Sequence, residues 1–215
     1  MDYYRQLIAA YREERPDGSY PSILINSIDL TRLLSLVADN RLAELTEYLR
    51  SEVDRLARAG AEFGLLAANT PHIVFEGLSR ASAIPLLSIV EAACDAAREL
   101  SLRTVGLLGT RFTMQGEFYP AVFARHGIRV RAPAAEDLAY VHERYVGELI
   151  PGEYRAETRE GILGVIDRMI QDGADGILLA GTELPLLLRG TPDPGVPLLD
   201  TNRLHVRRAV TELLA

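Results

Sequence analysis

The feature of this 215-residue sequence that most constrains its fold is an internal repeat. The segment VDRLARAGAEFGLLAANT (residues 53–70) aligns with IDRMIQDGADGILLAGTE (residues 166–183), and seven of the 18 aligned residues are identical. Farther along, IPLLS (residues 84–88) matches VPLLD (residues 196–200) in the same order and almost the same register. Each long copy reads as an amphipathic helix, a glycine turn, an apolar strand and small polar residues. The two matched blocks therefore indicate a duplicated strand–helix–strand unit.

Short apolar runs alternate with amphipathic stretches along the whole chain. The predicted strands are residues 22–27, 63–67, 84–88, 104–109, 128–131, 176–180 and 196–199. The predicted helices are residues 3–12, 43–59, 89–100, 114–126, 156–172 and 202–214. Most of the strand candidates are continuous aliphatic runs, which are typical of strands covered on both faces. The alternation predicts an α/β fold with mostly parallel sheets and right-handed crossovers.

The repeat divides this α/β fold into two pseudo-symmetric lobes. We expect residues 1–99 and 201–215 to form lobe 1 and residues 100–200 to form lobe 2, with a ligand cleft between the lobes. Lobe 2 opens with a strand and a glycine turn at residues 104–109, whereas the sequence of lobe 1 opens directly on the helical pattern MDYYRQLIAAY. The symmetry therefore predicts that the first strand of lobe 1 is missing.

Composition excludes several classes of partner. A net charge of −7 disfavours a nucleic-acid surface and an anionic membrane surface. No run of about 18 apolar residues and no secretory signal pattern is found. Cys94 is the only cysteine, so the chain can form no intrachain disulfide and no thiolate metal cluster. We expect a cytoplasmic protein without a metal.

Small polar residues follow the repeated strands and point to a ligand site. Ligands bind outside the carboxyl ends of parallel strands, and hydroxyl and amide donors there suit a carboxylate. The candidate substrate-binding residues are Asn69, Thr70, Thr110, Thr113 and Thr182. Taken singly, a Ser, Thr or Asn before a helix is more often a simple cap. The repetition of the device, rather than any one turn, favours a binding site.

Three side chains near these turns are candidate acid/base groups. His72 follows the first repeated strand, Glu183 follows the second, and His205 lies on the first turn of the last helix. A histidine beside a carboxylate can be tuned toward neutral pH. The alternatives are a partly buried helix-start residue for His72 and a first-turn acid that complements the helix dipole for Glu183. Arg111, Arg159 and Arg203 are candidate counter-charges for a side-chain carboxylate.

Four segments carry a family resemblance. They are AANTPH (residues 67–72), LLGTRFTMQGEFY (residues 107–119), LAGTELPLLL (residues 179–188) and LLDTNRLH (residues 198–205). In this order they resemble the PLP-independent aspartate/glutamate racemase family over essentially the whole chain. The resemblance implies two pseudo-symmetric α/β lobes, a homodimer, and racemisation of a free amino acid without metal, PLP or nucleotide.

The resemblance also implies two catalytic cysteines that this chain lacks. Racemisation removes the α-proton from one face and returns a proton to the other, so two acid/base groups must flank the α-carbon. In the family these are cysteines just before Asn-Thr and just before Thr-Glu, and a thiol can be tuned for this task. Here the two positions are Ala68 and Gly181, which carry no exchangeable proton.

Three hypotheses follow. The first is a cofactor-independent racemase for an acidic amino acid that uses other bases, with His72 on one side and Glu183 or His205 on the other. The second is a one-base lyase, decarboxylase or isomerase acting on a small dicarboxylate. The third is a non-catalytic carboxylate binder.

Overall fold

The structure is a computed structural model that describes residues 2–215, which divide into two compact units. Unit 1 consists of the residues up to Ala67, Pro71–Ile89 and His205–Ala215. Unit 2 consists of Ala68–Thr70 and Val90–Leu204. Within the described residues, no helix has the length and apolar character needed to cross a membrane.

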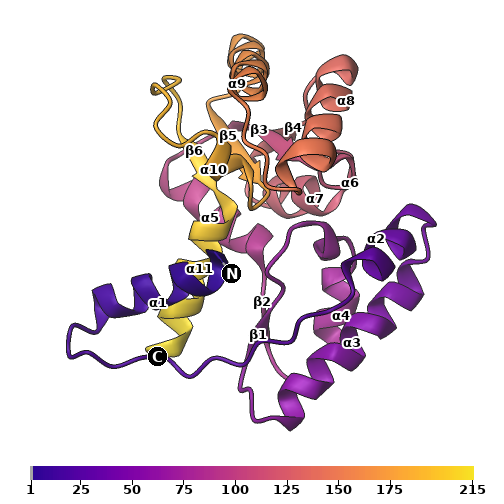
Figure 1. Cartoon of the computed structure of the whole chain (residues 1–215), viewed down its shortest axis with the longest axis vertical. Coiled ribbons are helices and arrows are strands. Elements are labelled where there is room, and N and C mark those ends of the chain that lie inside the picture. The colour runs from indigo at the N-terminus through magenta and orange to yellow at the C-terminus, as the bar shows by residue number, and fades with distance from the viewer. Residues whose placement is uncertain (1) are drawn as a thin grey trace. The chain divides into compact units, whose positions relative to one another are not determined.

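Unit 1 is built from helices around a short parallel sheet. Its strands are β1 (Gly64–Leu65) and β2 (Leu86–Leu87). Its helices are α1 (Asp2–Glu14), α2 (Leu30–Ala38), α3 (Leu42–Arg58), the 3-10 helix η1 (Thr70–Val74, whose first residue belongs to unit 2) and α4 (Phe75–Ala81). Helix α3 packs against both α2 and α4 (Figure 1). Leu7 of α1 packs on the His205–Leu213 part of α11 (Thr201–Leu213).

Unit 2 is built around a four-stranded parallel sheet. The strand order is β4 (Arg129–Arg131), β3 (Thr104–Gly109), β5 (Gly176–Ala180) and β6 (Leu198–Asp200). Its helices are α5 (Ile89–Glu99, whose first residue belongs to unit 1), α6 (Arg111–Met114), α7 (Phe118–Ala124), α8 (Ala135–Arg144), the π-helix η2 (Tyr145–Leu149), α9 (Ala156–Gln171) and α10 (Leu184–Leu187). Figure 1 shows α8 and α9 standing on the same side of the strands.

The main core of unit 2 lies between the sheet and these two helices. Leu108 of β3 and Leu179 of β5 are register partners on one face of the sheet and are buried against α8 and α9. Gly106 on the same face allows α9 to approach closely, because a Cβ there would lie 2.8 Å from Cε of Met169. Continuous apolar strands are therefore required, since both β3 and β5 are buried at every residue.

The duplication predicted from the sequence is reproduced element by element. Helices α3 and α9 end at equivalent residues, and each is followed by a glycine with positive φ, Gly60 at +95° and Gly173 at +92°. In both turns, the residue after the glycine donates its amide to the carbonyl five residues earlier, at 3.0 Å. This is the hydrogen bond that closes a Schellman-type helix end. The parallel pair β1–β2 corresponds to β5–β6.

The sequence prediction of a strand at residues 22–27 is wrong. This segment forms neither strand nor helix. Leu24 and Ile25 are exposed, and the segment is attached to α3 through the Asn26 side chain, which donates to the Glu52 carboxylate at 2.8 Å. The apolar run therefore lacks the neighbouring strand that would turn an extended segment into a sheet strand.

The single helix predicted at residues 114–126 is also wrong. The chain forms α6 and α7 with a break around Gly116. A Cβ at Gly116 would lie 2.7 Å from the carbonyl oxygen of Phe112 and 2.5 Å from the Phe118 ring, so the break requires a glycine. The sequence prediction gave only the starts of the helical segments after β1 and β5, where η1, α4 and α10 lie, and it missed α2 and α8. Of these, α8 matters most for the site, because the π-helix that continues it carries Tyr145.

Candidate functional site

Hydroxyl groups gather at the carboxyl end of the unit 2 sheet. Gly109, the last residue of β3, is the register partner of Ala180, the last residue of β5, so the residues that follow them lie at the same edge. Oγ1 of Thr110 lies 3.3 Å from Oγ1 of Thr70 and 3.2 Å from Oγ1 of Thr113. We call Thr70, Thr110 and Thr113 the hydroxyl cluster.

Local structure holds the hydroxyl cluster in place. Thr110 is the N-cap of α6, and its Oγ1 accepts from the Thr113 amide at 3.4 Å. Gly109 permits this packing, because a Cβ there would lie 2.7 Å from the carbonyl oxygen of Ala180. Thr113 is fully buried and Thr110 is partly exposed. A ligand would therefore contact the cluster at Thr110, while the buried Thr113 holds Thr110 in position.

Asn69 is fixed beside the cluster by a chain of hydrogen bonds. The Tyr119 hydroxyl donates to Oδ1 of Asn69 at 2.6 Å, and Nδ2 of Asn69 donates to Oγ1 of Thr201 at 3.2 Å. The Thr201 hydroxyl donates onward to the carbonyl of Leu179 at 3.0 Å. This chain sets the orientation of the Asn69 amide and uses only one of its two N–H groups. Burial raises the pKa of Tyr119, which keeps its hydroxyl a donor.

Asp200 occupies two amides in the first turn of α11. Oδ1 of Asp200 accepts from the amides of Asn202 and Arg203 at 3.0 and 3.1 Å. The side chain of Asn202 is different: among residues 2–215, its buried Oδ1 has no hydrogen-bond partner. A buried acceptor without a donor costs about 1–3 kcal/mol. A ligand N–H group would satisfy this atom.

The end of β5 carries a second polar group. Glu183 accepts a hydrogen bond from the Tyr145 hydroxyl, and Thr182 also interacts with Tyr145. Burial raises the pKa of Tyr145 well above its ordinary value, and the negative charge of Glu183 adds to this shift. The phenol is therefore protonated at neutral pH and donates to the carboxylate.

Unit 1 contains the two histidines singled out from the sequence, at a ring-centroid separation of 6.2 Å. Nε2 of His205 lies 3.0 Å from the carbonyl oxygen of Leu87, so this nitrogen must donate. Nδ1 of the same ring then accepts from the Tyr3 hydroxyl. Burial lowers the pKa of His205 to about 4. These contacts describe a neutral imidazole with both nitrogens engaged, which favours a structural role over a base.

His72 is also engaged within unit 1. Its Nε2 lies 3.2 Å from the Ile89 amide and therefore accepts from it, and its ring stacks on Phe75 at 4.9 Å. The side chain is almost fully buried. The lone pair that a general base would use is thus directed at the first residue of α5. The sequence-predicted set of three acid/base candidates is divided, with both histidines in unit 1 and Glu183 in unit 2.

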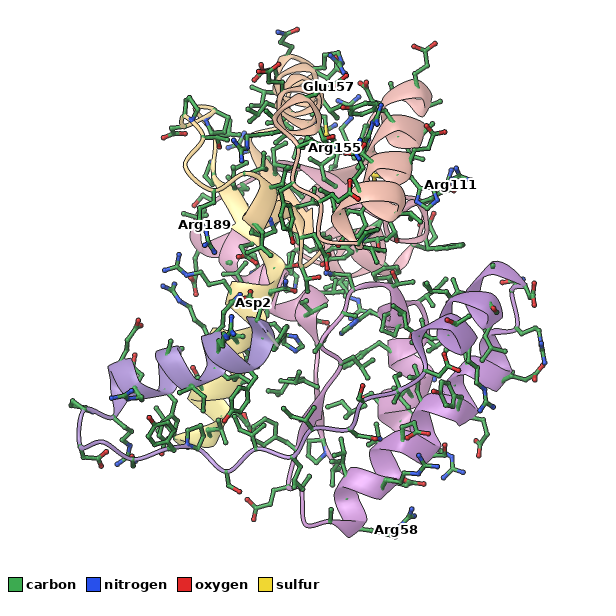
Figure 2. All side chains as sticks on the ribbon, in the orientation of Figure 1. Asp2, Arg58, Arg111, Arg155, Glu157 and Arg189 are labelled. Carbon is green, nitrogen blue, oxygen red and sulfur yellow. The ribbon has the colours of Figure 1, made fainter. Side chains whose placement is uncertain are left out.

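The candidate counter-charges do not form part of the hydroxyl cluster. Nε of Arg159 donates to the carbonyl of Leu187 at 2.7 Å. Arg111 and Arg203 are exposed, and Figure 2 shows the Arg111 side chain on the outside of unit 2 beside α8. Among residues 2–215, no group of three or more His, Cys, Asp or Glu side chains could hold a metal ion.

Sequence reasoning missed three residues of this region: Tyr119, Thr201 and Tyr145. Tyr119 and Thr201 contact Asn69 from 50 and 132 residues away, and Tyr145 contacts Glu183 from 38 residues away. Tyr119 lies in one of the segments that carry the family resemblance, and Thr201 directly follows the matched segment VPLLD (residues 196–200). For Tyr145, the neighbouring sequence contains no motif that indicates a functional role.

The comparisons with known proteins agree with this architecture. The profile of the Asp/Glu/hydantoin racemase family matches residues 1–209. The broad specificity amino-acid racemase RacX from Bacillus subtilis (strain 168) is 23% identical, and the alignment covers 100% of this chain and 90% of that protein.

Two solved structures are more similar in sequence. An Asp/Glu racemase candidate from Yersinia pestis superposes with a TM-score of 0.90 at 29% identity, covering 100% of this chain and 93% of that one. An aspartate racemase homologue from Pyrococcus horikoshii OT3 gives a TM-score of 0.83 at 30% identity, covering 99% and 92%. The α/β fold with parallel sheets predicted from the sequence is thereby confirmed.

Proposed function

Because this chain belongs to the Asp/Glu/hydantoin racemase family, we propose that it binds a free acidic amino acid and exchanges the α-proton without a cofactor. The hydroxyl cluster of unit 2 binds the α-carboxylate in this proposal. Removal and return of the α-proton at the bound amino acid then interconverts the enantiomers.

The observation that carries the proposal is the convergence of three hydroxyls at the carboxyl end of β3, where Oγ1 of Thr110 lies 3.3 Å from Oγ1 of Thr70 and 3.2 Å from Oγ1 of Thr113. A threonine hydroxyl can rotate its proton, so Thr110, the partly exposed member, can donate to a carboxylate oxygen, and Thr70 and Thr113 can donate to Thr110. Hydrogen bonds to a charged group are worth about 1.5–3 kcal/mol each, more than the hydroxyl–hydroxyl contacts that they replace. The same donors stabilise the negative charge that develops when the α-proton leaves.

Two neighbouring groups complete the recognition of an amino acid. The hydrogen bonds that join Tyr119, Asn69 and Thr201 use one N–H group of the Asn69 amide. The second N–H group supplies a further donor to the carboxylate. The partnerless Oδ1 of Asn202 accepts from the α-ammonium group. An acidic substrate class is suggested by the relatives, of which one is an aspartate racemase homologue, while RacX has broad specificity.

A second function is favoured by one specific observation. Ala68 and Gly181, where the resemblance expects the two cysteines, carry no acid/base group. A protein that keeps the carboxylate-binding hydroxyls and has lost proton transfer is a carboxylate binder. The α-proton distinguishes the two functions, since only an enzyme exchanges it with solvent.

The test is ¹H NMR in D₂O with L- and D-aspartate and L- and D-glutamate in turn. Loss of the α-proton signal together with appearance of the other enantiomer supports the racemase. Thermal stabilisation by these amino acids without loss of the signal supports the binder. Neither exchange nor stabilisation with any of the four would contradict both functions.

A matched pair of threonine variants tests the hydroxyl cluster. We expect Thr110→Val to weaken amino-acid binding roughly 10-fold or more, because the isosteric side chain removes one charge-assisted donor. Thr211→Val is the control, because the Thr211 hydroxyl donates to the carbonyl of Arg207 on an exposed turn of α11. Equal affinity in the two variants would exclude the cluster as the carboxylate site.

A further inference from the structure

The space that a side chain at position 181 would fill is taken by a tyrosine. A Cβ built on Gly181 would lie 2.2 Å from the Tyr145 hydroxyl oxygen and 2.6–2.7 Å from two atoms of its ring. Real Cβ atoms essentially never approach a neighbour within 3.0 Å. Tyr145 can occupy this space only because residue 181 is a glycine. We call this the matched arrangement of Gly181 and Tyr145.

The hydroxyl of Tyr145 is the polar tip of an otherwise core side chain. Tyr145 is only 4% exposed and packs in the main core of unit 2 with residues of α8, α9 and β5. It is the first residue of the π-helix η2, directly after α8. Single-turn π-helices occur frequently at functional sites. The core thus fixes the ring, and the hydroxyl lies at the polar end of β5.

Glu183 completes the arrangement. Its carboxylate accepts from the Tyr145 hydroxyl, and it lies two residues beyond Gly181 on the same strand end. The strand end of β3 that carries Thr110 is the direct neighbour in the sheet. A phenol with a carboxylate behind it can donate a proton or pass one on, which neither Gly181 nor Ala68 can do.

We propose that the Tyr145 hydroxyl, backed by Glu183, is the proton carrier of unit 2 and acts where position 181 has no side chain. This inference rests on the proposed function, since it requires an amino acid bound at the hydroxyl cluster. In the forward step the Cα–H bond breaks and its electron pair stays on the α-carbon. The proton moves to the Tyr145 oxygen while the phenolic proton moves to the Glu183 carboxylate.

This relay balances in charge and needs no further reactant. Glu183 goes from carboxylate to carboxylic acid as the substrate gains one negative charge, and the reverse step returns a proton to the α-carbon. The relay also avoids a free phenolate, which burial disfavours. A proton that has reached Glu183 can exchange with solvent, because this side chain is partly exposed. The α-proton of the substrate is thereby replaced by a solvent proton.

The experiment compares Tyr145→Phe and Glu183→Gln with Tyr140→Phe in the D₂O exchange assay. We expect the first two variants to lose 10²–10⁴-fold in exchange rate, the usual contribution of a general acid/base group. Tyr140, on α8, contacts Gly161 rather than Glu183, so its variant keeps the wild-type rate. Ligand-induced thermal stabilisation is measured in parallel and stays within about two-fold for all three, since the hydroxyl cluster is intact.

The outcomes separate this inference from the proposed function. Undiminished exchange in Tyr145→Phe overturns the inference and leaves the proposed function standing. Absence of exchange in the wild-type protein overturns both. A second measurement tests the shared space directly: Gly181→Ala lowers the melting temperature because its Cβ meets the Tyr145 ring, and an unchanged melting temperature would overturn the matched arrangement.

Discussion

At the scale of single residues, His205 shows how burial decides what an ionisable group can do. The imidazole is held between the Leu87 carbonyl and the Tyr3 hydroxyl, and burial lowers its pKa from 6.5 to about 4. A base with so low a pKa takes up an α-proton poorly at neutral pH. The same contacts make His205 a determinant of stability.

The lowered pKa of His205 predicts that the free energy of unfolding falls as the pH is lowered. Above pH 6.5 the histidine is neutral in both folded and unfolded chains, and its full contribution is present. As the pH falls from 6.5 toward 4, the unfolded chain takes up a proton that the folded chain does not, so stability is lost. We expect a loss of about 2 kcal/mol between pH 7 and pH 5 from this residue alone.

The measurement is urea unfolding at pH 7 and pH 5 for the wild-type chain and for His205→Gln. Glutamine keeps a side-chain donor but does not titrate, so the variant should lose less stability on acidification than the wild type. An identical pH dependence in both proteins would show that His205 is already charged at pH 5.

At the scale of elements, one identical position of the repeat is a glycine whose backbone conformation other residues rarely adopt. Gly60 and Gly173 end equivalent helices with φ of +95° and +92°, and no atom lies within 4 Å of a Cβ built on either. If a side chain at either position lowers the free energy of unfolding, the reason is therefore backbone strain and not a steric clash. Sequence identity at these two positions reflects one helix-ending device used twice.

We expect Gly60→Ala and Gly173→Ala each to destabilise the chain by about 1–2 kcal/mol, because alanine is strained in the left-handed region. Gly164→Ala, within α9, is the control. A Cβ there has only an ordinary contact at 3.5 Å, with Nη1 of Arg168. This control should gain up to about 1 kcal/mol in helix propensity. The measurement is the midpoint of chemical unfolding for each variant. Equal stability of Gly173→Ala and wild type would show that the positive φ at this position does not require glycine.

At the scale of the whole molecule, each unit has its own buried apolar cluster. In unit 2 the cluster joins β3 and β5 to α8 and α9, and in unit 1 a smaller cluster joins α1 to the His205–Leu213 part of α11. Free energies of local opening follow such clusters. A substitution that weakens one cluster should therefore lower the free energy of local opening most in the unit that contains it.

We expect Ile166→Ala to destabilise unit 2 by about 2–5 kcal/mol, because Ile166 is fully buried in this cluster. Hydrogen–deuterium exchange should accelerate in β3 and β5 more than in α3 and α4. Val146→Ala, at an exposed position, should stay within about 0.5 kcal/mol of wild type. Equal acceleration in both units would mean that the chain opens as one cooperative body.

Local sequence determined much of this protein. The aliphatic runs of β3 and β5, the helix ends at Gly60 and Gly173, and the order of parallel strand and helix were all readable, because periodicity and turn chemistry act over a few residues. Short-range preference also explains the errors. The apolar run at residues 22–27 is strand-like by composition but has no pairing partner, and Gly116 breaks a pattern that is otherwise helical.

Only the tertiary structure decided which candidate side chains can carry out chemistry. Thr70 and Thr110 meet across 40 residues, and Tyr145 enters the space beside Gly181 across 36. Burial made His205 a neutral structural group although its sequence context indicated a base. The reason is physical: hydrogen-bond partners and desolvation depend on long-range packing, and no local pattern in the sequence encodes them.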